Sequence, residues 1–246
     1  MFNGTVSLRA AIKGNGLQFS AFEFNPNEPG IDKVAIEGPL GDYLVSTVHV
    51  SSVATQQDGR ELAAKTTAAA LDRLTYHHGV AIEDARITGN HFSPLNPPPG
   101  VAFTAETGDY VCVSDSVKIV LGISPVQLKQ ELELATHPGE RYFGLFRSAM
   151  LSSSQVEAFL HLYHLLLMLY DSQADVDAFI MRRDPGVPQT QHPIKKSGVM
   201  ETVYTRLRNE FAHTRPGVNI ASTKVEMANR LGALRELTKR AIELHT

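Results

Sequence analysis

The sequence predicts an α+β fold, with a mixed sheet and one main helix in its first half and a helical bundle in its second. Three observations support this prediction. Short segments of alternating polarity, separated by turn residues, fill residues 1–124. Apolar residues at spacings of three and four dominate residues 125–246, and the change falls at Ser124-Pro125, a typical helix start. We therefore expect two domains, 1–124 and 125–246.

Composition is that of a globular protein. The 246 residues, 43% hydrophobic and 20% charged, suffice for one large domain or two ordinary ones. The single cysteine, Cys112, allows no internal disulfide, so we expect a reducing, cytoplasmic location. The longest apolar run, residues 159–170, is too short to cross a bilayer, and residues 1–12 do not read as a signal peptide. We expect no membrane association.

Several classes of site are absent from the sequence. It contains no Gly-rich phosphate loop followed by Lys and Ser or Thr, no zinc-type Cys and His spacing, and no Gly-x-Ser-x-Gly turn. The formal net charge of −3 is not that of a basic nucleic-acid-binding surface. Acidic residues outnumber basic ones in the first half, and basic residues slightly outnumber acidic ones in the second half. A polyanion would therefore bind the second half, and we expect no metal or cofactor.

The first half begins with predicted strands. Residues 5–12 and 17–24 are joined by Gly14-Asn15-Gly16, which predicts a hairpin turn. Strands at residues 34–37 and 43–50 follow. Alternation in the latter predicts an apolar face made by Leu44, Ser46, Val48 and Val50.

A helix is predicted over residues 58–76, with Asp58 as its cap and Gly79 as its end. Its apolar stripe consists of Leu62, Thr66, Ala69, Ala70, Leu71 and Leu74. Further strands are predicted at residues 80–87, 101–104 and 110–123, which would complete the sheet.

The second half predicts an antiparallel bundle of four main helices preceded by smaller ones. Helices are expected at residues 126–135, 140–150, 155–170 and 174–183, then a polar loop to Gly198, a helix ending near His213, and a last helix at 223–244. Ser154 and Ser222 are the expected caps. The helix at 155–170 is apolar almost all round, so we expect it to be central, with His161 and His164 buried and hydrogen-bonded.

The helix that ends at His213 combines three polar groups. Arg208 and Asn209 are adjacent, and Asn209 lies one helical turn before His213. Pro216 predicts that the helix ends soon after. A permanent cation, an amide and a titratable imidazole suit the binding of a phosphate and the movement of a proton beside it. The alternative is a solvated helix end at which the cation complements the helix dipole.

The pattern Arg208-Asn209-x-x-x-His213 resembles the signature of HEPN domains, which is Arg, a polar residue, three variable positions and His. Only Arg208 is followed by a polar residue among the arginines at this approximate spacing from a histidine, the others being Arg73, Arg86 and Arg206. The resemblance covers about the last hundred residues. The layout of the two halves is also similar to proteins of methylamine-utilisation clusters.

The resemblance implies a metal-independent ribonuclease that acts as a homodimer through the signature helix, with the N-terminal domain as sensor or regulator. Arg208, His213 and Asn209 would be catalytic, and Tyr204 and Arg215 would bind substrate. The alternative that the family also allows is a non-enzymatic module binding a nucleotide or a partner. A third hypothesis places the function in the N-terminal domain, as a small-molecule-binding accessory protein.

Overall fold

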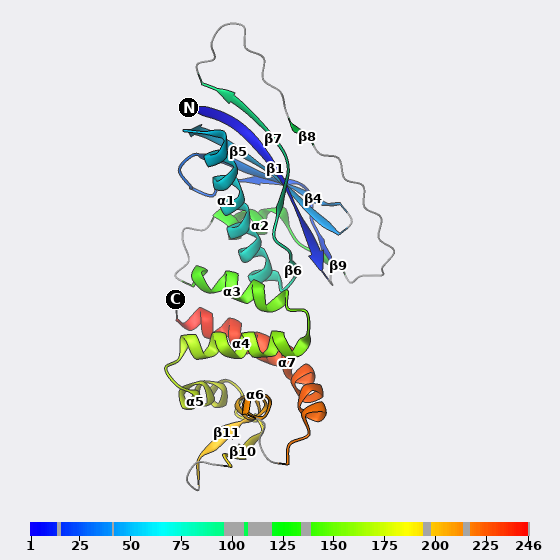
Figure 1. The fold of residues 1–246 in the computed structure, drawn as a ribbon, viewed down its shortest axis with the longest axis vertical. Helices are drawn as coiled ribbons and strands as arrows, with labels where there is room; N and C mark the ends of the chain where they lie inside the picture. Colours follow the sequence, from blue (N-terminus) through cyan, green and yellow to red (C-terminus); the bar gives the residue numbers. More distant parts are fainter. Residues whose placement is uncertain are drawn as a thin grey trace. The chain divides into compact units, whose positions relative to one another are not determined.

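The structure, a computed structural model, has the predicted α+β architecture, with a mixed, mainly antiparallel sheet region followed by a helical region (Figure 1). It describes residues 1–13, 16–40, 42–95, 106–107, 120–133, 139–193, 198–213 and 217–245. The chain divides into two compact units, Met1–His137 and Pro138–Thr246.

The first unit is built on a sheet whose described strands follow the order β3-β4-β5-β1-β7-β8, with every neighbouring pair antiparallel. β6 pairs with the end of β1, and a separate parallel pair joins β2 to β9. The strands are β1 (Phe2–Lys13), β2 (Gly16–Gln18), β3 (Phe22–Phe24), β4 (Ile31–Leu40), β5 (Tyr43–Val53), β6 (Ala81–Ile82), β7 (Arg86–Pro94), β8 (Glu106–Thr107) and β9 (Val120–Gly122).

One face of this sheet packs against helix α1 (Gln56–His78) (Figure 1). Successive strand residues point to opposite faces, and burial alternates accordingly along β1 and β5. The predicted inner face of β5 is confirmed, since Leu44, Ser46, Val48 and Val50 are all buried. The core of this unit lies between that face and the buried helix residues Ala63, Ala70, Leu71 and Leu74.

Helix α1 begins with a capping box. Thr55 Oγ1 accepts a hydrogen bond from the Asp58 N–H at 3.1 Å, and Asp58 Oδ2 accepts one from the Thr55 N–H at 2.9 Å. Thr55 is therefore the cap, and Asp58, the predicted cap, lies in the first turn. The helix ends as predicted at Gly79, whose φ of 66° is left-handed and favours glycine.

The predicted hairpin between the first two strands is wrong. β1 has β5 along one side and β7, then β6, along the other, so both of its sides are already paired. The predicted single strand at residues 80–87 is also wrong, because residues 83–85 separate the short strand β6 from β7, which begins at Arg86. The predicted strand at residues 101–104 lies outside the described residues, and so do residues 110–119 of the strand predicted at 110–123.

Helix α2 (Pro125–Glu133) belongs to the first unit, although the sequence predicted a boundary before it, at 124/125. The helix packs on α1 and β3. Its Leu132 carbonyl accepts a hydrogen bond from Arg73 Nη1 at 2.7 Å, and its Glu131 Oε2 lies 2.7 Å from His78 Nε2. These contacts place the division of the chain after α2 rather than before it.

The second unit contains helices α3 (Glu140–Met150), α4 (Gln155–Leu169), α5 (Gln173–Arg183), α6 (Val203–His213) and α7 (Ile220–Leu244). α4 contacts each of the other four, which agrees with its expected central place. Its inner face includes Phe159, Leu162, Tyr163 and Leu166. His161 and His164, expected to be buried, are exposed on the opposite face.

Two further expectations for this unit are wrong. The expected polar loop to Gly198 contains β10 (Gln189–Gln191), which pairs with β11 (Met200–Thr202), so α6 begins only at Val203. The last helix is capped by Asn219, whose Oδ1 accepts the N–H groups of Ala221 and Ser222, so Ser222 is not the cap. Ser154 caps α4 as predicted.

None of the helices within the described ranges combines the length and the apolar character that crossing a lipid bilayer would require.

Two glycines in helices give a test of the first unit's packing. A Cβ at Gly59 of α1 would lie 2.5 Å from Cε1 of the buried Phe92 ring, whereas one at Gly232 of α7 would meet nothing within 4 Å. We expect Gly59→Ala to lower the free energy of unfolding by about 1–3 kcal/mol through overpacking. We expect Gly232→Ala, the matched control, to raise it by roughly 0.5–1 kcal/mol because alanine favours helix. Urea unfolding measures both, and a stabilised Gly59→Ala variant would contradict the packing.

Candidate functional site

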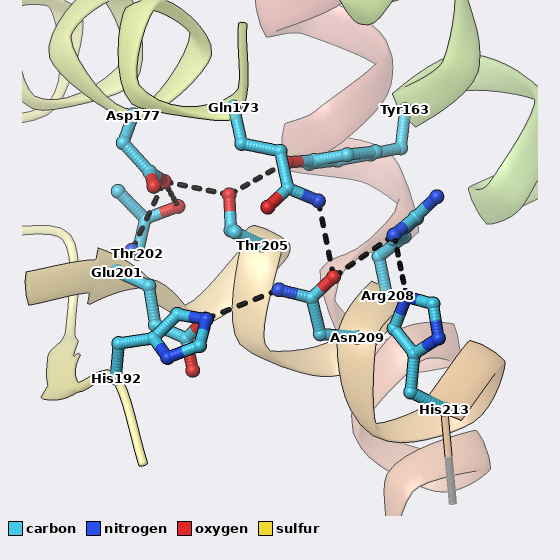
Figure 2. Close-up of polar contacts among 10 residues, drawn as sticks. All are labelled: Tyr163, Gln173, Asp177, His192, Glu201, Thr202, Thr205, Arg208, Asn209 and His213. Atoms are coloured by element: carbon cyan, nitrogen blue, oxygen red, sulfur yellow. Dashed lines mark hydrogen bonds and ion pairs between the residues drawn. The ribbon is translucent and has the colours of Figure 1, made fainter. Parts of the chain in front are cut away.

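The predicted trio meets at the end of α6. Arg208 Nη1 lies 2.9 Å from Asn209 Oδ1 and 3.3 Å from His213 Nε2 (Figure 2). Arg208 is half-buried and His213 is exposed, so the pair lies where a ligand can reach it. The helical spacing brings these groups together as the sequence predicted.

The contact between Arg208 and His213 assigns the protons of the imidazole. A guanidinium can only donate hydrogen bonds, so His213 Nε2 accepts and its proton is on Nδ1. A histidine in this form is neutral, and Nε2 is the nitrogen that can take up a proton. The geometry thus presents an unprotonated imidazole nitrogen beside a permanent cation.

Asn209 is the buried member of the trio. Asn209 is 3% exposed, and hydrogen bonds to three neighbouring side chains fix the orientation of its amide. Oδ1 accepts from Arg208 and from Gln173 Nε2 at 3.1 Å, and Nδ2 donates to Glu201 Oε2 at 3.2 Å. Expected to be catalytic, Asn209 lies beneath the surface and positions Arg208.

The two arginines of α6 differ in how their charge is balanced. Arg206 contacts Glu210 at 2.8 Å and Glu226 at 2.7 Å. Burial alone would lower the pKa of Arg206, but its hydrogen bonds to Glu226 and Glu210 raise it. Arg208, by contrast, has no carboxylate partner within the described part of the chain, and both of its hydrogen-bond partners are neutral. Its positive charge is available to an anion.

A second set of hydrogen bonds joins the start of α6 to the rest of the unit. Asp177 Oδ1 accepts from the Thr202 N–H at 3.0 Å and from the hydroxyls of Thr202 and Thr205, each at 2.6 Å. Because the Thr205 hydroxyl donates to Asp177, the Tyr163 hydroxyl must be the donor in its 2.7 Å contact with Thr205. These bonds connect α4, α5, β11 and α6 (Figure 2).

Burial dominates the ionisation of this set. It raises the pKa of the Tyr163 hydroxyl far above its ordinary value, so Tyr163 remains a donor. It also raises the pKa of Asp177, an effect that the hydrogen bonds from Thr202 and Thr205 only partly offset and that the nearby Glu201 carboxylate increases. His192 Nε2 lies 4.0 Å from Glu201 Oε2, the oxygen that also accepts from Asn209.

Of the two residues expected to bind substrate, Tyr204 is a core residue. Its side chain is 1% exposed, and its ring stacks on Phe159 with 6.3 Å between ring centroids. The expectation that Tyr204 binds substrate is therefore wrong, because the residue lies on the inner face of α6. Arg215 lies outside the described residues.

Sequence reasoning missed Gln173, Glu201 and Asp177. Asp177 carries a signal, because it lies three residues before the apolar Ile180 on the same side of α5, and a charged residue on an apolar side must find partners. Nothing in the sequence marks Gln173 or Glu201, since both become part of the site only when β11 and α5 come together with α6.

Searches against models of protein families, curated proteins and solved structures returned no match to this chain.

The raised pKa of Asp177 predicts a pH dependence of stability. The folded carboxyl binds its proton more tightly than the unfolded one, whose ordinary pKa is 3.8. Its contribution to stability is therefore lost as the pH rises from that value through the raised folded pKa. Asp177→Asn keeps an oxygen to accept from Thr202 and Thr205 and removes the ionisation.

We expect the free energy of unfolding of Asp177→Asn, minus that of the parent, to increase with pH across this window and then level off. Urea unfolding at a series of pH values measures it. Asp171→Asn, at an exposed position just before the same helix, is the control and should show no such trend. A difference independent of pH for Asp177→Asn would contradict the assignment.

Proposed function

We propose that the C-terminal unit is a HEPN-like domain that cleaves RNA without a metal, with the N-terminal unit as its sensor or regulator. The observation that supports it most is the uncompensated guanidinium of Arg208 in contact with the accepting Nε2 of an exposed His213. A cation that binds a phosphate and a neutral imidazole that takes a proton are two of the groups that cleavage of an RNA phosphodiester uses. The expected compartment is the cytoplasm, where Cys112 stays reduced.

Cleavage would proceed by attack of the ribose 2′-oxygen on phosphorus. His213 Nε2 takes the proton of the 2′-hydroxyl, the new bond to phosphorus forms, and the bond to the 5′-oxygen breaks. The products are a 2′,3′-cyclic phosphate and a 5′-hydroxyl, whose proton comes from a second, protonated imidazole. Arg208 binds the phosphate oxygens and offsets the charge that develops on them. For this step Nη1 must exchange His213 for the phosphate, which leaves Nε2 free to act.

A second copy of the chain would supply the second imidazole. One α6 presents a single His213, and cleavage needs both a base and an acid. The family resemblance implies that two signature helices face each other in a shared cleft. A two-fold arrangement brings the same residues of both protomers to one site.

The alternative is a non-enzymatic module that binds a nucleotide or a partner. It is favoured by the hydrogen bond from Arg208 to His213 Nε2, because that bond occupies the nitrogen which catalysis requires. In this case Arg208 and His213 would together hold an anion and no bond would break.

We expect His213→Ala to lower cleavage of single-stranded RNA by about 10²–10⁴-fold, the range that proton transfer by a positioned group contributes. Arg208→Lys should also be strongly impaired, because an ammonium does not replace a planar, bidentate phosphate-binding group. Asn209→Ala should lose less, since Asn209 acts through Arg208. The assay is RNA cleavage with EDTA present, on variants shown to be folded.

The matched control is Arg206→Lys, on the same helix but ion-paired within the unit, which should retain cleavage. His161→Ala and His164→Ala, at exposed positions on α4, are further controls and should also retain cleavage. Full activity in His213→Ala, or loss of the parent's activity with EDTA, would exclude this mechanism. Phosphate binding without cleavage of any RNA would favour the alternative.

The homodimer gives a separate prediction. We expect light scattering at micromolar concentration to give twice the mass of the chain, 26.9 kDa. Ala212→Glu places a carboxylate at an exposed position beside His213 on α6, where like charges of two protomers would meet. It should shift the protein to monomer and reduce cleavage. A monomeric parent would count against the shared cleft.

A further inference from the structure

Gln173 joins the Arg208 site from a different helix. It is the first residue of α5, directly after the cap Ser172, and it is half-buried. Its Nε2 donates to Asn209 Oδ1 at 3.1 Å, the same oxygen that accepts from Arg208 Nη1 at 2.9 Å (Figure 2). The amide of Gln173 and the guanidinium of Arg208 are therefore neighbours around one acceptor.

The orientation of the Gln173 amide follows from which of the neighbouring groups donate hydrogen bonds and which accept them. Arg208 can only donate, so Asn209 must turn its oxygen toward it, and the Asn209 nitrogen then faces the Glu201 carboxylate, an acceptor. With Asn209 Oδ1 directed to this side, Gln173 must present its nitrogen to it. Gln173 Oε1 is thereby directed away from Asn209, as Figure 2 shows.

Two hydrogen-bonding groups of Gln173 are left for a ligand. Oε1 has no hydrogen-bond partner among the described residues, and Nε2 uses one of its two hydrogens on Asn209. An amide with one acceptor and one donor side by side matches adenine, whose N6 amino group donates and whose N7 accepts. In a nucleotide, the base is separated from the phosphate by the ribose. A phosphate bound by Arg208 would therefore place its base a short distance away, where the Gln173 amide lies.

We propose that Gln173 is a specificity-determining residue that binds the adenine of the nucleotide whose phosphate binds Arg208. The inference rests on the proposed function only in that Arg208 binds a phosphate. It holds for a nuclease, which would then cleave next to adenine, and for a nucleotide-binding module alike.

The test compares adenosine 5′-monophosphate with inosine 5′-monophosphate, in which a carbonyl oxygen replaces the N6 amino group. Titration calorimetry on the full chain should give a preference for the adenosine nucleotide of about fivefold or more, the low end of what a bidentate amide contact to adenine provides. Inorganic phosphate is the third probe, because it tests Arg208 alone.

Gln173→Met keeps the length of the side chain and removes both groups, and should reduce the preference to about one. Gln155→Met is the matched control. Gln155 is likewise the first residue of a helix after a serine cap, but it is exposed and lies on α4. It should retain the preference of the parent, and its failure to do so would count against the assignment to Gln173.

The outcomes separate the inference from the proposed function. If the parent binds inorganic phosphate, and Arg208→Ala does not, but the two nucleotides bind equally well, the assignment of Gln173 is wrong while the phosphate site stands. If the preference persists in Gln173→Met, another residue binds the base and the assignment is again wrong. If the parent does not bind phosphate, both the proposed function and this inference fail.

Discussion

The buried amide of Asn209 is the interaction on which the polar cluster depends. An amide has one end that only donates and one that only accepts, and here each end meets a group of the opposite kind. The Glu201 carboxylate takes the donor end, and Arg208 and Gln173 take the acceptor end. Since the amide is almost fully buried, reversing it would leave several groups without partners at a cost of about 1–3 kcal/mol each. One side chain thus sets the orientation of three others.

The same arrangement keeps the charge of Arg208 available. The Glu201 carboxylate contributes to the position of Arg208 through a neutral amide rather than by direct contact. A direct ion pair, such as that of Arg206 with Glu210, would orient a guanidinium as well but would also neutralise it. The distinction matters because attraction between opposite charges is strongest at short range and in a partly buried setting. A neutral intermediary therefore permits both a fixed position and an unbalanced charge.

The cluster also depends on a hairpin that has little stability of its own. β10 and β11 are three residues each, and a two-stranded hairpin of that length is marginal in water. Asp177 binds Thr202 at the end of β11 and Thr205 in the first turn of α6. That carboxyl therefore joins strand and helix, and places Glu201, next to Thr202, beneath Asn209.

The sequence by itself determined most of the elements. Alternation in β5, the serine cap of α4, the glycine end of α1 and the meeting of Arg208, Asn209 and His213 are local effects of period, capping and helical spacing. It did not determine the pairing of β2, the β10–β11 hairpin or the inclusion of α2 in the first unit. Strand pairing depends on which edges remain free after other strands have paired, and no local pattern contains that information.

The tertiary structure alone decided what surrounds the signature. Tyr204 and Arg208 lie on one helix, and only packing against α4 shows that the first is core and the second is accessible. Gln173 is distant in sequence from Asn209, and Glu201 lies on a strand that the sequence did not predict. Spacing along a helix determines which residues of that helix can meet. The partners that orient them come from other elements, because a buried amide must find its donors and acceptors wherever the fold brings them.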